Sequence, residues 1–351
     1  ASFAIQTHSF NYPANLIVPY LTSEMNFRRP IINYQLILPI QIMQVHRDIE
    51  NLPVFNNAVV TIGTFDGVHM GHRQVIDKLL SESKAINGES VIVTFHPHPR
   101  KVVSSTILGI RLINTLDEKI ELLEAIGIDH LVIVPFTDAF ANQPAEEYVE
   151  HFLFDKFHPH TIIIGYDHRF GRDRLGDYRL LEKLSKELNF QLKEIPKHIL
   201  ENISISSTNI REAILHNDIA TADKLLGYNF FFSGTVVHGN KLGRQLGYPT
   251  ANLKMEDEEK IIPGNGIYAV YAQVEGSEDR IKGMMSIGFR PTVDGKTKVI
   301  EVNLFDFDKE IYDQQLKVFV KKYLREEVKY DNLEDLVKQI DQDKLNSLKV
   351  L

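Results

Sequence analysis

Short apolar runs alternate with segments of helical periodicity between Ala58 and Leu188, and this alternation constrains the fold most strongly. The runs are rich in β-branched residues and apolar on both faces, as central strands of a parallel sheet are: AVVTIGTF, SVIVTF, HLVIVPF and TIIIGY. The segments between them carry apolar residues at helical spacing: HRQVIDKLLSESKAI, TLDEKIELLEAIG, PAEEYVEHFLFDKF and DYRLLEKLSKEL. Because parallel strands need crossover connections, the pattern predicts an open α/β sheet.

Local signals mark both ends of the second predicted helix. Asp117 and Glu118 lie in its first turn, where the helix dipole favours acidic side chains. Gly127 follows the last apolar position, as glycine does at helix C-terminal ends. The helix is therefore expected to end at Gly127.

Three loops follow predicted strands directly: TFDGVHMGH, TFHPHPR and GYDHRFGRDRLGD. In open α/β sheets, ligands bind beyond the carboxyl ends of the strands. We therefore expect the three loops to meet at one edge of the sheet and to form a site there.

The pattern changes near Tyr228. Beyond it, period-2 stretches are separated by glycine, proline or charged turns: FFFSGTVVHG, GIYAVYAQVEG, IKGMMSIG, KVIEVNLFDF and LKVFVKKYL. This pattern is typical of an antiparallel sheet or barrel, and an amphipathic helix over LEDLVKQIDQDKLNSL follows it. We predict two domains, residues 43–228 and 229–351.

Composition limits the partners and the compartment. The chain has no cysteine, so disulfides and thiolate metal sites are excluded and a reducing compartment, the cytoplasm, is expected. Its formal net charge of −8 argues against nucleic acid or an anionic membrane as the main partner, and a weak homo-oligomer stays open. No apolar run approaches the roughly 20 residues of a membrane span.

The first 42 residues show little periodicity and no motif. They lack the charged start, apolar middle and cleavage site of a signal peptide. Met43 opens a segment that reads like a natural start, MQVHRDIENLP. We expect Ala1–Ile42 to be an extension outside the folded unit.

His69 and His72 in TFDGVHMGH have three readings: a metal-binding pair, a phosphate cradle, or a surface turn. Zinc pairs on helices usually appear as HExxH with a third ligand, which is missing here. Gly71 makes the spot flexible, and a helix beginning at or just after it would offer free N–H groups and a positive dipole end to an anion. Phosphate binding is therefore the favoured reading.

GTFDGVHMGH resembles the nucleotidyltransferase signature of the bacterial bifunctional riboflavin kinase/FAD synthetase family. TFHPHP, GYDHRFGRDRLGD, ISSTNIR and GTVVHGNKLGRQLGYPTANL follow in the order of that family, and SIGFRPTV, EVNLFDF and LREEVKYDNLEDLVKQI complete the resemblance. It covers residues 43–343. It implies a Rossmann-like α/β nucleotidyltransferase domain with a parallel sheet, followed by an antiparallel β-barrel riboflavin kinase domain with a C-terminal helix.

For the first half, the resemblance implies transfer of AMP from ATP to FMN, giving FAD and pyrophosphate. His69, His72 and Arg211 would stabilise charge on the phosphates, and the remaining residues would shape the nucleotide and flavin pockets. These are Gly63, Phe65, Asp66, Phe95, His96, Pro97, Gly165, Asp167, Phe170, Arg172, Ser206, Ser207 and Thr208. His96 and His98 also suggest a metal site, but the prolines beside them favour a structural or flavin-lining role.

For the second half, the resemblance implies phosphorylation of riboflavin by ATP. The chain has no GxxxxGK[ST], so it is not a P-loop kinase. Thr250 and Asn252 of the PTAN motif offer oxygen ligands of the kind Mg²⁺ accepts. Glycines 234, 239, 243 and 247 would let a loop fold over phosphates, and the site would also include Lys241, Arg244 and Pro249.

A carboxylate is expected to assist the neutral ribityl hydroxyl of riboflavin. The resemblance points to Glu301 in KVIEVNLFDF as that base, whereas an isolated strand carboxylate is otherwise usually solvated. Asn303 stands where many family members have histidine, which leaves its role open. Arg325 is expected to contact the flavin phosphate.

Other functions stay open at this stage. A nucleotidyltransferase making a cytidylyl- or pantetheine-linked product would share the HxGH pattern formed here by His69–His72, but the PTAN and EVNLFDF segments disfavour that function. A class I aminoacyl-tRNA synthetase shares two phosphate-binding motifs that HMGH and ISSTNIR resemble, and the acidic charge of this chain opposes that function. A flavin-binding regulator without catalysis would not need two phosphate-handling sets.

Overall fold

The computed structural model describes residues 42–103, 111–196, 205–239, 242–292 and 295–351. The predicted extension, Ala1–Ile42, lies outside these ranges apart from Ile42. Lys241, predicted to belong to the kinase site, also lies outside them.

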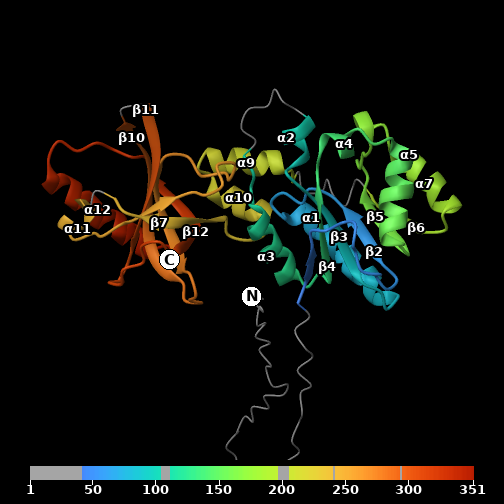
Figure 1. The fold of residues 1–351 in the computed structure, drawn as a ribbon. Coiled ribbons are helices and arrows are strands. Elements are labelled where there is room, and N and C mark those ends of the chain that lie inside the picture. The colour runs from blue at the N-terminus through green and yellow to red at the C-terminus, as the bar shows by residue number, and fades with distance from the viewer. Residues whose placement is uncertain (1–41, 104–110, 197–204, 240–241, 293–294) are drawn as a thin grey trace, which may run out of the picture. The chain divides into compact units, whose positions relative to one another are not determined.

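The first half contains a parallel sheet of six strands within the described residues, in the order β1-β4-β3-β2-β5-β6 (Figure 1). The strands are Gln44–His46 (β1), Val59–Ile62 (β2), Ser90–His96 (β3), His130–Pro135 (β4), Thr161–Gly165 (β5) and Gln191–Ile195 (β6). The four central strands, β2 to β5, confirm the prediction that the four apolar runs form strands. The edge strands β1 and β6 were not predicted, because QVH is very short and QLKEI is polar.

Helices cover both faces of this sheet, which explains why its central strands are apolar on both sides (Figure 1). Val59 and Val60 are adjacent in β2 and pack into different hydrophobic clusters, because successive strand residues point to opposite faces. Val59 packs with residues of Met70–Ala85 (α1) and Leu116–Ile126 (α3), and Val60 with residues of Tyr148–Phe154 (η1, a π-helix) and Tyr178–Glu187 (α7).

The remaining helices of the described residues are mostly short. In the first half they are Pro99–Val103 (α2), Asp138–Ala141 (α4), Ala145–Glu147 (α5), Asp155–Phe157 (α6), Arg172–Arg174 (η2), Ser207–Leu215 (α9) and Ile219–Leu226 (α10). In the second half they are Leu242–Gln245 (α11) and Leu333–Leu348 (α12). Helix α12 coincides with the predicted C-terminal helix. None of the helices in the described ranges combines the length and hydropathy that crossing a bilayer requires.

The second half forms a closed antiparallel barrel in the order β10-β11-β8-β7-β12-β9. Its strands are Phe231–Val237 (β7), Ala251–Lys254 (β8), Gly266–Val274 (β9), Ile281–Thr292 (β10), Gly295–Leu304 (β11) and Gln315–Arg325 (β12). One glycine prediction is wrong: Gly234 lies inside β7 opposite Leu316 and not in a phosphate loop. A side chain there would meet the carbonyl oxygen of Lys254 at 3.0 Å, so the close strand packing explains this glycine.

The hydrophobic core inside the barrel continues into two helices of the chain before Tyr228. Ile214 of α9 and Leu226 of α10 belong to the same buried cluster as Val270 and Val318 of the barrel. The two halves are therefore joined by apolar packing as well as by the chain.

Gly127 ends α3 in the left-handed conformation, as its position in the sequence predicted, with φ of 89°. A Cβ there would meet no heavy atom within 4 Å, so an added side chain costs only backbone strain. We expect Gly127→Ala to lower the free energy of unfolding by about 1 kcal/mol, and Gly127→Asn by less because asparagine tolerates this conformation. Urea unfolding followed by circular dichroism measures the difference, and equal losses for the two variants would contradict it.

Candidate active sites

The histidine pair of TFDGVHMGH begins helix α1. The helix starts at Met70, one residue before the predicted start, and His69 is its N-cap, accepting the backbone N–H of His72 on Nδ1 at 3.3 Å. The two imidazole rings stack with centroids 3.6 Å apart. This geometry places both rings at the positive end of the helix dipole.

The loop before this helix has an unusual backbone. Phe65, Gly67 and Val68 all have positive φ, at 47°, 92° and 37°. For Phe65 and Val68 this conformation is strained, and both side chains are buried, which holds it in place. The ring of Phe65 lies 5.2 Å from that of His72, and a Cβ on Gly63 would meet the Phe65 ring at 3.2 Å. The loop is therefore preformed around the histidines.

The electrostatics of this site favour neutral imidazoles. Burial lowers the pKa of His69 to about 4, with the nearby Asp66 carboxylate opposing the shift. Burial also lowers the pKa of His72 well below its ordinary value, and the charges of His69 and Lys119 add to this. Nδ1 of His72 is buried and has no hydrogen-bond partner within the described part of the chain. Both histidines can therefore donate hydrogen bonds without carrying a charge.

The segment ISSTNIR lies against TFDGVHMGH. Ser206 caps α9 by accepting the N–H of Asn209 at 3.2 Å, and Ser207 donates its hydroxyl proton to the carbonyl of Asp66 at 3.0 Å. Thr208 is exposed on the first turn.

Asp66 and Arg211 form a largely buried ion pair between the two motifs. The other carboxylate oxygen of Asp66 accepts the backbone N–H of Ile113 at 2.9 Å, so Asp66 is occupied by protein contacts. The Nε–H group of Arg211 donates to the carbonyl of Arg111 at 2.6 Å. The guanidinium is thus held in one orientation.

The β3 loop lies beside the β2 loop. Thr94 donates its hydroxyl to the carbonyl of Thr64 at 3.2 Å, which links the two loops. Phe95 packs against Phe136 and Phe140, and His96 is exposed. Pro97 follows at the end of the strand.

His98 completes this edge of the sheet. Burial lowers its pKa to about 4, and the charges of Asp66, Lys119 and Arg211 all act on it. His98 therefore belongs to the neighbourhood of the histidine pair.

The β5 loop divides into exposed and buried residues. Gly165 ends the strand, and Asp167 and Arg172 are exposed. Phe170 is buried against Tyr148 and bridges to Gly176, so it supports the loop from within the core. Because β2 lies between β3 and β5, the three loops follow neighbouring strands, as predicted.

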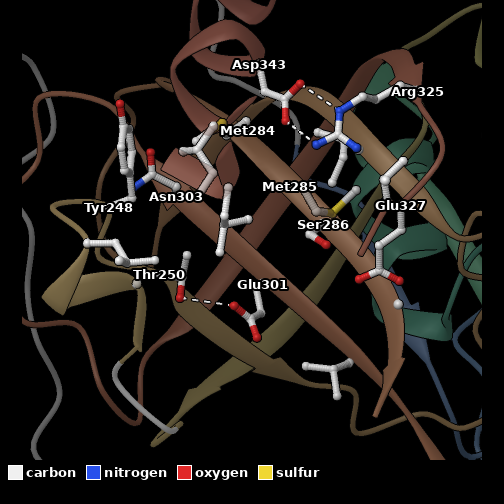
Figure 2. Close-up of a pocket in the computed structure, with 18 of the residues that line it drawn as sticks. Tyr248, Thr250, Met284, Met285, Ser286, Glu301, Asn303, Arg325, Glu327 and Asp343 are labelled. Atoms are coloured by element: carbon white, nitrogen blue, oxygen red, sulfur yellow. Dashed lines mark hydrogen bonds and ion pairs between the residues drawn. The ribbon is translucent and has the colours of Figure 1, made fainter. Parts of the chain in front are cut away.

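The barrel half contains a cavity of about 340 Å³ (Figure 2). Its wall is mostly apolar, with a few polar side chains, which is typical of sites for small organic ligands. The apolar lining residues are Leu246, Ile267, Met284, Met285, Phe289, Val299, Val328, Leu336 and Ile340.

Thr250, Asn252 and Glu301 all line this cavity. The Thr250 hydroxyl donates to Glu301 Oε2 at 3.3 Å (dashed in Figure 2), and Glu301 faces Asn252 across the β11–β8 pair. The PTAN oxygens and the predicted carboxylate therefore share one wall. A Cβ on Gly239 would meet the Asn252 amide at 2.2 Å, so only glycine fits beside it.

Asn303 anchors the turn that carries the PTAN motif. Its Nδ2 group donates to the carbonyl of Pro249 at 2.7 Å. A side chain on Gly243 would meet the carbonyl of Tyr248 at 2.3 Å, so the same turn requires that glycine. The contact gives position 303 a structural role that the sequence left open.

The other predicted residues of the barrel half lie nearby or on the surface. Gly247 has φ of 84°, and Arg244 forms an exposed ion pair with Glu310 at 3.7 Å. Arg325 lines the cavity but is paired with the buried Asp343 of α12, through two hydrogen bonds of 2.9 and 2.6 Å (Figure 2). This pair fixes α12 beside the cavity.

Comparison with known proteins assigns both halves. Residues 52–209 match the FAD synthetase family model, and residues 226–351 match the riboflavin kinase model. The bifunctional riboflavin kinase/FMN adenylyltransferase of Buchnera aphidicola is 38% identical, covering 86% of this chain and 96% of that protein. The protein of the same name from Haemophilus influenzae is 35% identical, covering 86% and 97%.

The chain belongs to the bifunctional riboflavin kinase/FMN adenylyltransferase family. A crystal structure described as a macrolide-efflux protein from Streptococcus pneumoniae is also similar, with 29% identity and a TM-score of 0.77 over 87% of this chain and 98% of that one. The match extends over both halves, so the pairing of sheet and barrel in one chain is shared.

Several residues of this bifunctional family member were not expected at the sites. Lys119 of α3 is buried beside the histidines and donates to the carbonyl of Thr64 at 2.6 Å. Burial lowers its pKa to about 8. Glu327 and Asp343 line the barrel cavity. No local pattern distinguishes these three residues from solvent-exposed charged residues, because their places in the sites depend on contacts between distant parts of the chain.

The stability of the fold should decrease as the pH is lowered, because His69 is buried in its neutral form. Its pKa of about 4 in the folded chain lies below the 6.5 of an unfolded histidine, so the unfolded chain binds more protons between these values. The free energy of unfolding therefore decreases as pH falls through this window, by about 2 kcal/mol between pH 7 and 5 from this group alone. His69→Asn, which keeps a capping side chain, should lose less stability over this range.

Urea unfolding at pH 7 and pH 5 measures this slope. His151→Asn is the matched control, because the hydrogen bond to Asp155 raises the pKa of this exposed imidazole and its removal should therefore not make the slope shallower. Equal slopes for His69→Asn and the unmodified chain would contradict the burial argument.

Proposed function

We propose that the barrel half phosphorylates riboflavin with ATP to FMN, and that the sheet half transfers AMP from ATP to FMN, giving FAD and pyrophosphate. The main support is the separate convergence of two polar sets, each with the chemistry that one step needs. One set lies at the carboxyl edge of the parallel sheet, and the other lines the apolar cavity of the barrel.

Adenylyl transfer requires alignment more than proton transfer. The FMN phosphate is already an anionic nucleophile, so the site must hold it in line with the α-phosphorus of ATP and stabilise spreading charge. His69 and His72 would donate hydrogen bonds to phosphate oxygens from the start of α1, where free backbone N–H groups add to the field. Their neutral state leaves them able to donate.

Arg211 would provide the positive charge of this site. Its Nη2 and Nε groups are held by Asp66 and the Arg111 carbonyl, which leaves guanidinium N–H groups to meet a phosphate. Asp66 would thus act by orienting Arg211, and Ser206, Ser207 and Thr208 would present hydroxyls and the α9 N-terminus beside it.

Phosphorylation of riboflavin uses a neutral alcohol, so Glu301 would accept the proton of the ribityl hydroxyl. Thr250 and Asn252 carry hard oxygen donors on the same wall as this carboxylate, and this donor set fits Mg²⁺. A magnesium ion bound there would offset the charge of the ATP phosphates. The methionines and aliphatic side chains of the cavity would contact the flavin ring.

The expected setting follows from the substrates. Riboflavin, FMN and ATP are small metabolites, so we infer that the chain works in the cytoplasm without nucleic acid or membrane partners. The absence of cysteine and the net charge of −8 support this.

Glu301→Gln should lower FMN formation by roughly 10² to 10⁴ and spare adenylylation of supplied FMN, because only the first step needs a base. The chain is incubated with riboflavin, ATP and Mg²⁺, and the flavins are separated over time. The unmodified chain should give FMN and then FAD. Glu326→Gln is the control, because Glu326 is exposed next to Arg325. Equal loss of both activities in Glu301→Gln would refute the assignment of Glu301 as the base for riboflavin phosphorylation.

His72→Ala should do the reverse. Loss of one donor to the charged transition state should slow FAD formation from FMN and ATP by roughly 10² to 10³, with riboflavin phosphorylation retained. The same separation of flavins provides the measurement, and His151→Ala is the matched histidine control. Normal FAD formation by His72→Ala would remove the phosphate role from this motif.

A further inference from the structure

Lys260 is a buried charge that lies outside both proposed sites. It belongs to the loop between β8 and β9 of the barrel half, and its side chain has no solvent exposure. Its ammonium group donates to the Glu118 carboxylate at 2.5 Å, the Ile113 carbonyl at 2.6 Å and the Phe231 carbonyl at 2.8 Å. The three N–H groups thus have three acceptors, two of them in the sheet half.

The energetics of this contact require close geometry. Burial lowers the pKa of Lys260, and the Glu118 carboxylate opposes the shift. A buried ammonium is stabilised only when its partners stay in place, and losing one partner leaves an uncompensated charge. Glu118 is itself fixed by the capping box of α3, in which the same oxygen accepts the N–H of Thr115 at 3.0 Å. The loop of the barrel half and the start of α3 therefore hold each other rigidly.

Ile113 connects this contact to the adenylyl-transfer site. Its carbonyl accepts from Lys260, and its N–H donates to Asp66 Oδ1 at 2.9 Å. Asp66 Oδ2 in turn holds Arg211. The backbone of one residue, Ile113, and the carboxylate of Asp66 thus separate Lys260 from the guanidinium proposed to meet phosphate.

We propose that Lys260 is a positioning residue for adenylyl transfer, supplied by the riboflavin kinase half to the FMN adenylyltransferase half. It holds the Ile113 peptide, which orients Asp66 and through it Arg211. This inference rests on the proposed phosphate role of Arg211. It implies that efficient FAD formation depends on a residue of the barrel half that touches neither ATP nor FMN.

Other ion pairs between the two halves differ from this one. Lys317 pairs with Glu121 of the same helix α3, but the Glu121 side chain is 59% exposed. Lys101 pairs with Glu259 at 2.6 Å, again on the surface. Exposed pairs contribute little to stability, and within the described residues neither pair hydrogen-bonds to Ile113 or Asp66. Lys317→Met is therefore the matched control for Lys260→Met.

The test measures both activities in the same chain. Lys260→Met should lower kcat/KM for adenylylation of FMN roughly 10-fold to 100-fold relative to riboflavin phosphorylation, since small misplacements of a charged group have effects of this size. Lys317→Met should leave the ratio of the two activities unchanged. The double variant Lys260→Met/Glu118→Gln removes both buried charges, keeps an acceptor for the Thr115 N–H, and should recover thermal stability while adenylylation stays low.

A double-mutant cycle with Arg211→Ala separates positioning from general destabilisation. If Lys260 acts through Arg211, Lys260→Met should add little to the loss caused by Arg211→Ala. Full additivity, or normal adenylylation by the stable double variant, would overturn the inference while leaving the role of Arg211 intact. Normal adenylylation by Arg211→Ala would overturn both.

Discussion

The buried carboxylate of Asp66 is the contact on which the proposed adenylyl-transfer site depends. One carboxylate oxygen accepts the N–H groups of Ile113 and Asn114, and the other pairs with Arg211. The backbone carbonyl of Asp66 accepts the hydroxyl proton of Ser207. Because a carboxylate at 2% exposure needs all of these partners, the two phosphate motifs cannot separate without leaving a charge unpaired. The motif TFDGVHMGH thus carries a structural centre as well as candidate catalytic groups.

The two halves meet different chemical demands with different environments. The sheet half buries imidazoles and keeps them neutral, which suits hydrogen bonding to an already anionic nucleophile. The barrel half places Glu301 beside the Thr250 hydroxyl in a cavity with an apolar wall, which suits proton removal from an alcohol. Each environment would serve the other step poorly, and this favours two separate sites in one chain.

Much of the fold could be predicted from periodicity, and the exceptions have physical reasons. The central strands carry strong patterns because they are buried on both faces of the sheet. The edge strands β1 and β6 and the helix α10 carry weak patterns, since they are short or bury little surface on their own. Gly234 was misassigned because a glycine that permits close strand packing looks the same in sequence as one that permits a tight loop.

The candidate sites could be found from motifs, but the residues that support them could not. Thr250, Asn252 and Glu301 were expected together, and they share one cavity wall. Asp66 was expected to shape the nucleotide site, whereas the structure directs its carboxylate at Arg211. Such contacts join residues more than 140 positions apart, so no local pattern encodes them.

The start of α3 shows why this limit is general. Asp117, Glu118 and Lys119 are three consecutive charged residues, which in sequence read as a solvated first turn. Only Asp117 is exposed. Successive helix residues point about 100° apart, so Glu118 can face Lys260 of the barrel half while Lys119 faces the Thr64 carbonyl beside the histidines. Two buried charges side by side are tolerable because each has a partner in a different part of the fold, and the partner of Glu118 is in place only once both halves have folded.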